Sequence, residues 1–510
     1  MFFMKTIKPN EESKSENCSI GNFNFRSRLL KDFMRRIICL AVSALAILTF
    51  PLHAQTVSGS KTPFTLISDE EIRQILIDRI DVQKKSVGMV VGIIDTHGRR
   101  IISYGHLTQG DNRPLNGQTI FEIGSFTKIF TALLLSDMVQ RGELDLTDPL
   151  EKYLPSGSKV PERNGKKITL VDLATHTSGL PFQPPDMTIG DPIATANYTV
   201  EQAYKFLSSY TLDYDIGTKW AYSNLDYGML GIALVNRAGM NYETLVKTRI
   251  TDPLGMKSTS TIVSTEMKLN LSVGHNAKLE PAIYWSMPAF QGASSLLSST
   301  DDILTFLSSF LGLTESPLKR AMEAMLKTHR PGPNFEQSLG WWVIPFGQDD
   351  EGIITFAGAT FGFTVTVAYD PKLKTGVVVF SNSTENDGGL AWHLLRPAFP
   401  VETSTAMKAI NERKEIAVDT KLLDKYTGKY KPNTGDVITI ERRGNAIYFI
   451  SPTAPYGLHL FAESEQKFFI KEADFQVTFQ TDSAGNATGI TVRFGGIEDT
   501  AQRVDMQNGR

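Results

Sequence analysis

The stretch 123–138 constrains the fold of this chain more than any other part of the sequence. It reads Ile-Gly-Ser-Phe-Thr-Lys and continues as a strongly apolar run. Large apolar residues recur in it at spacings of three and four, which predicts a helix that is buried over most of its surface. Gly124 marks the end of an extended segment, so Ser125 is expected in the first turn of this helix. A helix of this kind needs other helices or a sheet packed around it.

Ser125 and Lys128 are three residues apart and therefore share one face of the predicted helix. A serine hydroxyl is a poor nucleophile until a neighbouring group takes its proton. A lysine in an apolar, water-poor helix loses its charge more easily and can be that neighbour. The pattern indicates nucleophilic catalysis. The structural alternative is a serine that caps the helix and a lysine at the surface.

Composition argues against several classes of function. The chain has 510 residues, 41% of them apolar, and a formal net charge of −3, which is ordinary for a globular protein. No basic stripe is visible, so we expect no nucleic-acid partner. The eight histidines are scattered, and both cysteines, Cys18 and Cys39, lie in the first 54 residues. We therefore expect no metal site, no disulfide and no cofactor.

Residues 34–54 have the pattern of a secretory signal. An Arg-Arg pair precedes the apolar run 37–50, and Ala54 belongs to a small-residue cleavage site. The run is about fourteen residues long, which is short for a membrane span. We expect residues 1–54 to be a leader, the mature protein to be periplasmic or secreted, and no stable membrane span after cleavage. The alternatives are an uncleaved anchor and a true translation start at Met34.

The rest of the chain divides into parts of different periodicity. Residues 55–396 mix helical patterns with short strand patterns, which predicts a sheet with helices packed on it. Strand patterns near residue 88 and between 339 and 381 are expected in the same sheet. Residues 397–419 are a predicted linker. Residues 420–510 contain short alternating segments, typical of a small antiparallel barrel or sandwich.

A second polar cluster lies at Tyr222-Ser223-Asn224, just before the apolar helical pattern 225–238. A triplet on a loop ahead of a buried helix is well placed to present three polar groups to a cleft. The structural alternative is a turn in which Ser223 and Asn224 cap the helix.

Together, Ser-x-x-Lys, Tyr-Ser-Asn and a glycine-containing strand further along form a three-part pattern. It resembles the serine β-lactamase and penicillin-binding-protein superfamily, whose first motif is Ser-x-x-Lys. The Tyr-Ser-Asn form is similar to the class C β-lactamase-like branch, which includes D-alanyl-D-alanine carboxypeptidase/endopeptidases and related esterases. The resemblance covers roughly residues 70–395 and extends to the flanking stretches 142–149, 173–180 and 253–256. It implies an α+β fold with an antiparallel sheet flanked by helices, an all-helical subdomain, and then the small all-β domain.

The resemblance also implies roles for four residues. Ser125 would be the acylated nucleophile, and Lys128 would take its proton. Tyr222 would relay a proton to the leaving group, and Asn224 would hydrogen-bond the lysine and the substrate.

The third motif of this family is Lys/His-x-Gly on a strand that lines the cleft. Here Phe356-Ala357-Gly358 has the right place and glycine pattern, but Phe356 stands where the cation would be. The backbone N–H of Ala359, with that of Ser125, would form the oxyanion hole. A literal Lys374-Thr375-Gly376 follows a turn signal, and we interpret it as a hairpin turn.

The resemblance implies a secreted serine hydrolase that acts through an acyl-enzyme, as a D-alanyl-D-alanine peptidase or β-lactamase-like penicillin-binding protein. Its partner would be a small-molecule or peptidoglycan-type substrate, and no oligomeric state is assigned. One alternative is a carboxylesterase or amidase of the same fold, which Phe356 favours. Another is a catalytically weak protein that binds peptidoglycan or β-lactams, and a third is a scaffold protein whose C-terminal domain carries the function.

Overall fold

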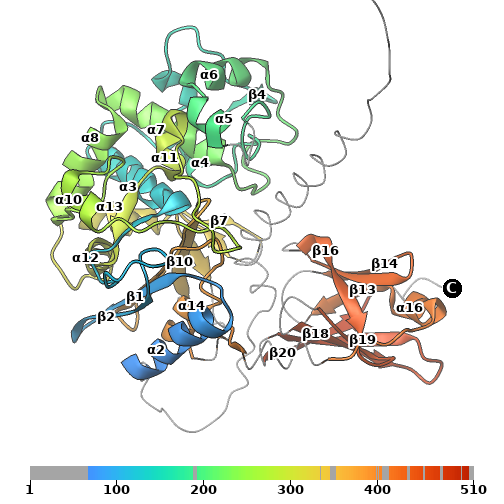
Figure 1. The fold of residues 1–510 in the computed structure, drawn as a ribbon. Coiled ribbons are helices and arrows are strands. Elements are labelled where there is room, and N and C mark those ends of the chain that lie inside the picture. The colour runs from blue at the N-terminus through green and yellow to red at the C-terminus, as the bar shows by residue number, and fades with distance from the viewer. Residues whose placement is uncertain are drawn as a thin grey trace, which may run out of the picture. The chain divides into compact units, whose positions relative to one another are not determined.

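The computed structural model describes residues 67–187, 192–333, 335–344, 352–397, 399, 401–404, 413–432, 437–451, 454–470, 475–494 and 497–504 (Figure 1). The predicted leader and the middle of the predicted linker lie outside these residues. Among the residues described, no helix combines the length and the apolarity that crossing a membrane requires.

An antiparallel sheet of eight strands organises the first part of the chain, in the order β2-β1-β12-β11-β10-β9-β8-β7. The predicted sheet that joins the segment near residue 88 to the segment 339–381 is therefore confirmed. The strands are β1 (Gly88–Asp95), β2 (Gly98–Gly105), β7 (Arg330–Pro331), β8 (Glu336–Gln337), β9 (Trp342–Ile344), β10 (Ile353–Ala359), β11 (Thr364–Asp370) and β12 (Thr375–Ser381).

The strand registers decide which residues share a face of this sheet. Phe356 is paired with Val367, Val367 with Val378, and Val378 with Gly92, so these four side-chain positions point the same way. A Cβ on Gly92 would meet Thr300 and Leu304 of helix α12 (Thr300–Phe310). Helix α12 therefore covers this face. Thr355 faces the opposite way, and its hydroxyl accepts a hydrogen bond from the indole of Trp392 in helix α14 (Leu390–Leu395).

Most of the helical segments lie between β2 and β7 in the chain (Figure 1). The predicted buried helix is α3 (Thr127–Gln140), in which every residue from Thr127 to Met138 is buried. The other helical segments are α2 (Asp69–Ile77), η1 (Asp78–Val82), η3 (Leu150–Tyr153), α4 (Leu170–Ala174), α5 (Pro192–Asn197), α6 (Val200–Ser209), α7 (Asn224–Ala238), α8 (Tyr242–Val246), η4 (Lys247–Thr251), α9 (Asp252–Leu254), α10 (Thr265–Leu269), η5 (Pro288–Phe290), α11 (Gln291–Ser294) and α13 (Lys319–Met325).

Two short antiparallel pairs complete this part of the chain. Strand β3 (Ile120–Glu122) pairs with β6 (Leu297–Ser299), and β4 (Glu162–Arg163) pairs with β5 (Lys166–Lys167). Strand β3 leads directly into Gly124 and Ser125. The expectation for Ser125 needs a small correction, since it lies in a separate 3-10 turn, η2 (Gly124–Phe126), immediately before α3.

A closed antiparallel barrel follows, with the strands in sequence order and β13 paired to β20. This confirms the predicted small all-β domain. It has a core of its own, in which the rings of Tyr426 and Phe479 stack at 4.1 Å. Its elements are α16 (Thr420–Tyr426), β13 (Gly428–Pro432), β14 (Ile438–Arg443), β15 (Ala446–Ser451), β16 (Ala454–Ala462), β17 (Lys467–Phe469), β18 (Phe475–Thr481), β19 (Ala487–Phe494) and β20 (Ile497–Arg503).

Candidate active site

The chain turns sharply between β3 and α3 and places Ser125 beside strand β10. Gly124 has a φ of +48°, in the left-handed region that favours glycine. A Cβ added to Gly124 would lie 2.4 Å from the carbonyl oxygen of Ala359. Only glycine therefore allows strand β10 to pass so close to this turn. Ser125 remains half-buried, so its hydroxyl is accessible from solvent.

Lys128 lies one helical turn further on and is completely buried. Its Nζ lies 3.0 Å from Ser125 Oγ, 2.8 Å from Asn224 Oδ1 and 3.0 Å from the carbonyl oxygen of Ala293. Asn224 is the first residue of α7, and Ala293 belongs to α11. Three helical segments therefore meet at this amine.

The charge state of Lys128 follows from its surroundings. Burial lowers the pKa of Lys128 well below its ordinary value, and the nearby carboxyl of Asp226 opposes this shift only in part. An uncharged amine has two N–H groups and one lone pair. Because Asn224 Oδ1 and the Ala293 carbonyl can only accept, they take the two N–H groups. The lone pair is then left for the hydroxyl proton of Ser125.

Tyr222 is the second side chain that reaches Ser125. Its hydroxyl hydrogen-bonds Ser125, and Lys128 Nζ lies 4.9 Å from the centre of its ring. Burial raises the pKa of Tyr222 above its ordinary value, while the bond to Ser125 lowers it. The structure thus brings Ser125, Lys128, Tyr222 and Asn224 together at one point.

Both interpretations of the Tyr-Ser-Asn triplet apply, each to a different residue. Ser223 is the N-cap of α7, since its Oγ accepts a hydrogen bond from the backbone N–H of Asp226. The same hydroxyl donates to the carbonyl oxygen of Pro181 at 2.7 Å. Asn224 instead points its side-chain oxygen at Lys128.

His176 holds the loop that contains Tyr222 in place. The sequence patterns did not predict this contribution. Its carbonyl oxygen accepts the N–H of Ala221 at 2.8 Å, and its Nδ1 accepts the N–H of Ser223 at 3.2 Å. Its ring lies 4.7 Å from that of Tyr222. Because Nδ1 accepts, the ring proton is assigned to Nε2. Burial lowers the pKa of His176 well below its ordinary value, and Lys128 lowers it further, so the ring is neutral.

Asp226 is a second residue that was missed, and it is fully buried next to His176. Its Oδ1 accepts the hydroxyl of Ser178 at 2.5 Å, and its Oδ2 lies 3.6 Å from His176 Nδ1. Burial raises the pKa of Asp226 well above its ordinary value, although the Ser178 bond lowers it. An acidic residue within the apolar pattern 225–238 was the signal that could have revealed it.

The expected third motif lies on β10. A Cβ on Gly358 would fall 2.0 Å from the carbonyl oxygen of Ile123, so this strand can pass the Ser125 turn only with glycine there. The backbone of Ala359 lies against Gly124 for the same reason. Phe356 is 1% exposed, and its ring packs 4.8 Å from that of Trp342.

The literal Lys374-Thr375-Gly376 lies at the hairpin between β11 and β12, as interpreted from the sequence: Lys374 belongs to the turn, and Thr375 and Gly376 begin β12. Asp370 pairs with Thr375 across the turn between β11 and β12, and Lys374 has a φ of +50°. A Cβ on Gly376 would meet Leu307 of α12 and Leu311, the residue that follows this helix, so this glycine faces the core.

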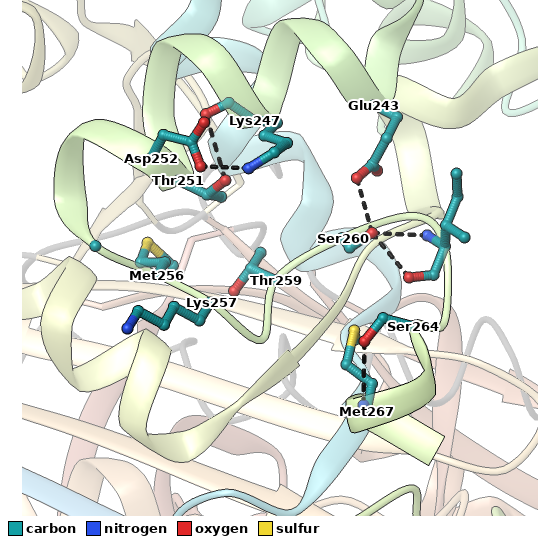
Figure 2. A pocket seen from close by; sticks show the side chains of 12 residues that line it. Glu243, Lys247, Thr251, Asp252, Met256, Lys257, Thr259, Ser260, Ser264 and Met267 are labelled. Carbon is teal, nitrogen blue, oxygen red and sulfur yellow. Dashed lines mark hydrogen bonds and ion pairs between the residues drawn. The ribbon is translucent and has the colours of Figure 1, made fainter.

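A separate pocket of about 350 Å³ lies among α8, η4, α9 and α10 (Figure 2). None of the predicted site residues lines it. Three of its charged side chains are paired locally, Lys247 with Asp252 at 2.5 Å and Glu243 with Ser260 at 2.8 Å. Within the described ranges, no three His, Cys, Asp or Glu side chains come close enough to hold a metal ion.

A family model described as Beta-lactamase matches residues 72–398, the part of the chain that contains the sheet and the site. The chain belongs to the beta-lactamase family. A model described as a domain of unknown function, DUF3471, matches residues 412–509.

Curated relatives and solved structures also match this part of the chain. The D-alanyl-D-alanine-carboxypeptidase/endopeptidase AmpH of Escherichia coli K12 is 31% identical over 330 residues, which cover 61% of this chain and 85% of AmpH. A beta-lactamase/D-alanine carboxypeptidase from Yersinia pestis has a TM-score of 0.53 at 27% identity, covering 62% of this chain and 94% of that one. A class C beta-lactamase from Rhodobacter sphaeroides has a TM-score of 0.57 at 26% identity, and the match covers 65% of this chain and 99% of that one. This beta-lactamase family protein is a serine hydrolase.

The burial of Lys128 predicts how stability depends on pH. In unfolded chains this lysine binds a proton up to its ordinary pKa of 10.5, whereas the folded protein releases it at lower pH. Between these two pKa values the unfolded state binds more protons, so the stability of the wild type rises with pH. The free energy of unfolding of the wild type minus that of Lys128→Met should rise by up to about 1.4 kcal/mol per pH unit.

Denaturant unfolding at pH 7, 8 and 9 measures this difference. Lys327→Met, at an exposed position after α13, is the matched control and should show no such slope. Parallel curves for the wild type and Lys128→Met would mean that Lys128 keeps its charge in the folded protein.

Proposed function

We propose that this protein forms an acyl-enzyme on Ser125 and acts as a D-alanyl-D-alanine peptidase of the penicillin-binding type. One observation carries the proposal: the buried amine of Lys128 lies 3.0 Å from Ser125 Oγ, with both its N–H groups directed to other acceptors. The similarity to AmpH, named as a D-alanyl-D-alanine-carboxypeptidase/endopeptidase, supports the substrate class.

The proposed reaction has two halves. Ser125 Oγ attacks the carbonyl carbon of the substrate while its proton passes to Lys128 Nζ. The carbonyl oxygen becomes negative and accepts hydrogen bonds from the backbone N–H groups of Ser125 and Ala359. The bond to the leaving group then breaks, and the proton held by Lys128 is relayed through Tyr222 to that group, so both residues regain their starting states. Water attacks the resulting ester, which releases the acid and restores the serine, while Asn224 keeps the amine in place.

Cleavage of esters or amides is the second candidate, and Phe356 favours it. A phenyl ring in the place of Lys or His cannot donate a hydrogen bond or neutralise a substrate carboxylate. Its ring instead packs against Trp342. Substrates without a free carboxylate lose nothing from this replacement, because the backbone N–H groups of the oxyanion site do not depend on the side chain.

We predict that Ser125→Ala abolishes both covalent labelling by a fluorescent penicillin and turnover of a p-nitrophenyl ester. Among the residues that the structure describes, the hydrogen-bond contacts of the Lys128 amine include no other hydroxyl nucleophile, so no residual acyl transfer is expected. Ser209→Ala, at an exposed position in α6, is the control and should behave as the wild type. Turnover that survives in Ser125→Ala would disprove the assignment, and labelling of the wild type without any turnover would indicate a binding protein.

We predict that simple esters are cleaved better than substrates with a free carboxylate. Phe356→Lys or Phe356→His should shift the ratio of the two kcat/KM values toward the carboxylate-bearing substrate. Lys374→Ala should leave both values unchanged, because that residue lies on a hairpin turn. If Lys374→Ala greatly lowered kcat/KM while the Phe356 variants left it unchanged, the third motif would be Lys374-Thr375-Gly376 at the start of β12.

We also propose that the protein is exported to the periplasm or secreted, and that residues 1–54 are removed. The Arg-Arg pair, the apolar run and Ala54 support this proposal. N-terminal sequencing of the exported protein checks it, and a first residue upstream of Arg35 would contradict it.

A further inference from the structure

The backbone on both sides of Tyr222 is held by a single residue, His176. The N–H of Ala221, which precedes Tyr222, donates to the carbonyl oxygen of His176 at 2.8 Å. The N–H of Ser223, which follows Tyr222, donates to Nδ1 of the His176 ring at 3.2 Å. The same ring lies 4.7 Å from the ring of Tyr222. These three contacts leave little backbone freedom at Tyr222.

The segment that contains His176 is also joined to helix α7, which holds Lys128. The N–H of Asn224, the first residue of α7, donates to the carbonyl oxygen of Phe182 at 2.8 Å. The side chain of Asn224 accepts from Lys128 Nζ. The segment 176–182 therefore contacts both the loop of Tyr222 and the residue that orients the lysine. His176 is itself fixed, since it is 1% exposed.

The two ring nitrogens of His176 have different surroundings. Nδ1 accepts the N–H of Ser223, and Oδ2 of Asp226 lies 3.6 Å from Nδ1, beyond hydrogen-bond distance. Nε2 is buried and has no hydrogen-bond partner among the residues that the structure describes. A buried N–H without a partner costs free energy. A phenyl ring would fill the same space without that cost, so the position favours imidazole for its acceptor at Nδ1.

We propose that His176 is a positioning residue: its Nδ1 and its carbonyl oxygen hold Tyr222 where the tyrosine can pass a proton to the leaving group. This inference rests on the proposed acyl-enzyme at Ser125. The hydroxyl of Tyr222 hydrogen-bonds Ser125, so a shift of the loop would take the hydroxyl away from the path of the proton. The contact of Lys128 with Ser125 lies within one helical turn and does not depend on this loop. Loss of the Nδ1 acceptor should therefore affect mainly the proton transfer to the leaving group.

The test measures kcat/KM for the p-nitrophenyl, phenyl and ethyl esters of butyric acid, which all form the same acyl-enzyme. The p-nitrophenolate ion leaves without a proton, whereas the poorer leaving groups need one increasingly. His176→Gln places its amide near the position of Nε2 and leaves no acceptor at Nδ1. Its kcat/KM for the phenyl and ethyl esters should fall by about tenfold or more relative to the p-nitrophenyl ester. His176→Asn, whose Oδ1 takes the place of Nδ1, should keep these ratios within about threefold of the wild type.

A double-mutant cycle connects the effect to the hydroxyl of Tyr222. Tyr222→Phe should show the same dependence on the leaving group, and His176→Gln should add no further dependence once that hydroxyl is absent. His97→Gln, in the turn between β1 and β2 with a side chain that is 93% exposed, is the matched control and should keep the wild-type values. Where His176→Gln fails to fold, His176→Phe keeps a ring, lacks the acceptor and should give the same result.

The outcomes separate this inference from the proposed function. An equal loss for all three esters in His176→Gln would indicate a purely structural role and would overturn the inference, as would unchanged kcat/KM values. A dependence on the leaving group that His176→Gln still adds in the Tyr222→Phe background would also contradict it. In each of these cases Ser125→Ala remains inactive. Turnover in Ser125→Ala would instead overturn the acyl-enzyme itself.

Discussion

The buried amine of Lys128 is the contact on which the rest of this site depends. Water cannot satisfy it, so the protein must supply acceptors, and it does so from the first residue of α7 and from α11. This requirement fits the burial of α3 from Thr127 to Met138, since other helices must close over it to exclude water. The packing of the core therefore also places the Lys128 amine beside Ser125.

Further buried side chains hold the loop of Tyr222 and strand β10 in place around Lys128. His176 holds the loop of Tyr222 through two backbone contacts and its ring, and it does so with a φ of +56°, unusual for a residue other than glycine. On the other side, Gln337 accepts the indole N–H groups of both Trp220 and Trp342 at 3.1 Å. Because Trp342 also packs on Phe356, this cluster links the tyrosine loop to the strand of the third motif.

Much of this arrangement was predictable from the sequence, for physical reasons that differ between its parts. Helix α3, the strands β10 to β12 and the barrel follow from local periodicity, and the contact of Ser125 with Lys128 follows from helical spacing. The support from His176 and Asp226 was not predictable in this way, because each acts on residues far away in the chain. The imidazole of His176 leaves no periodic trace, and the carboxyl of Asp226 shows only as an acidic residue within the apolar pattern 225–238. Even Ala293, which completes the environment of the amine, contributes only a backbone carbonyl that any residue could offer.

The close approach of Gly124 to strand β10 also limits how this protein can evolve. A side chain at Gly124 or Gly358 would collide with backbone atoms, which cannot be moved aside by a change of rotamer. Both positions are therefore closed to substitution as long as the strand lies where it does. Phe356, two residues before Gly358, packs its ring on that of Trp342, and a contact between two side chains can adapt to an exchange. Substitutions that change which substrates this fold accepts should therefore accumulate at such side-chain positions. The path of the backbone beside Ser125 should stay the same in related proteins.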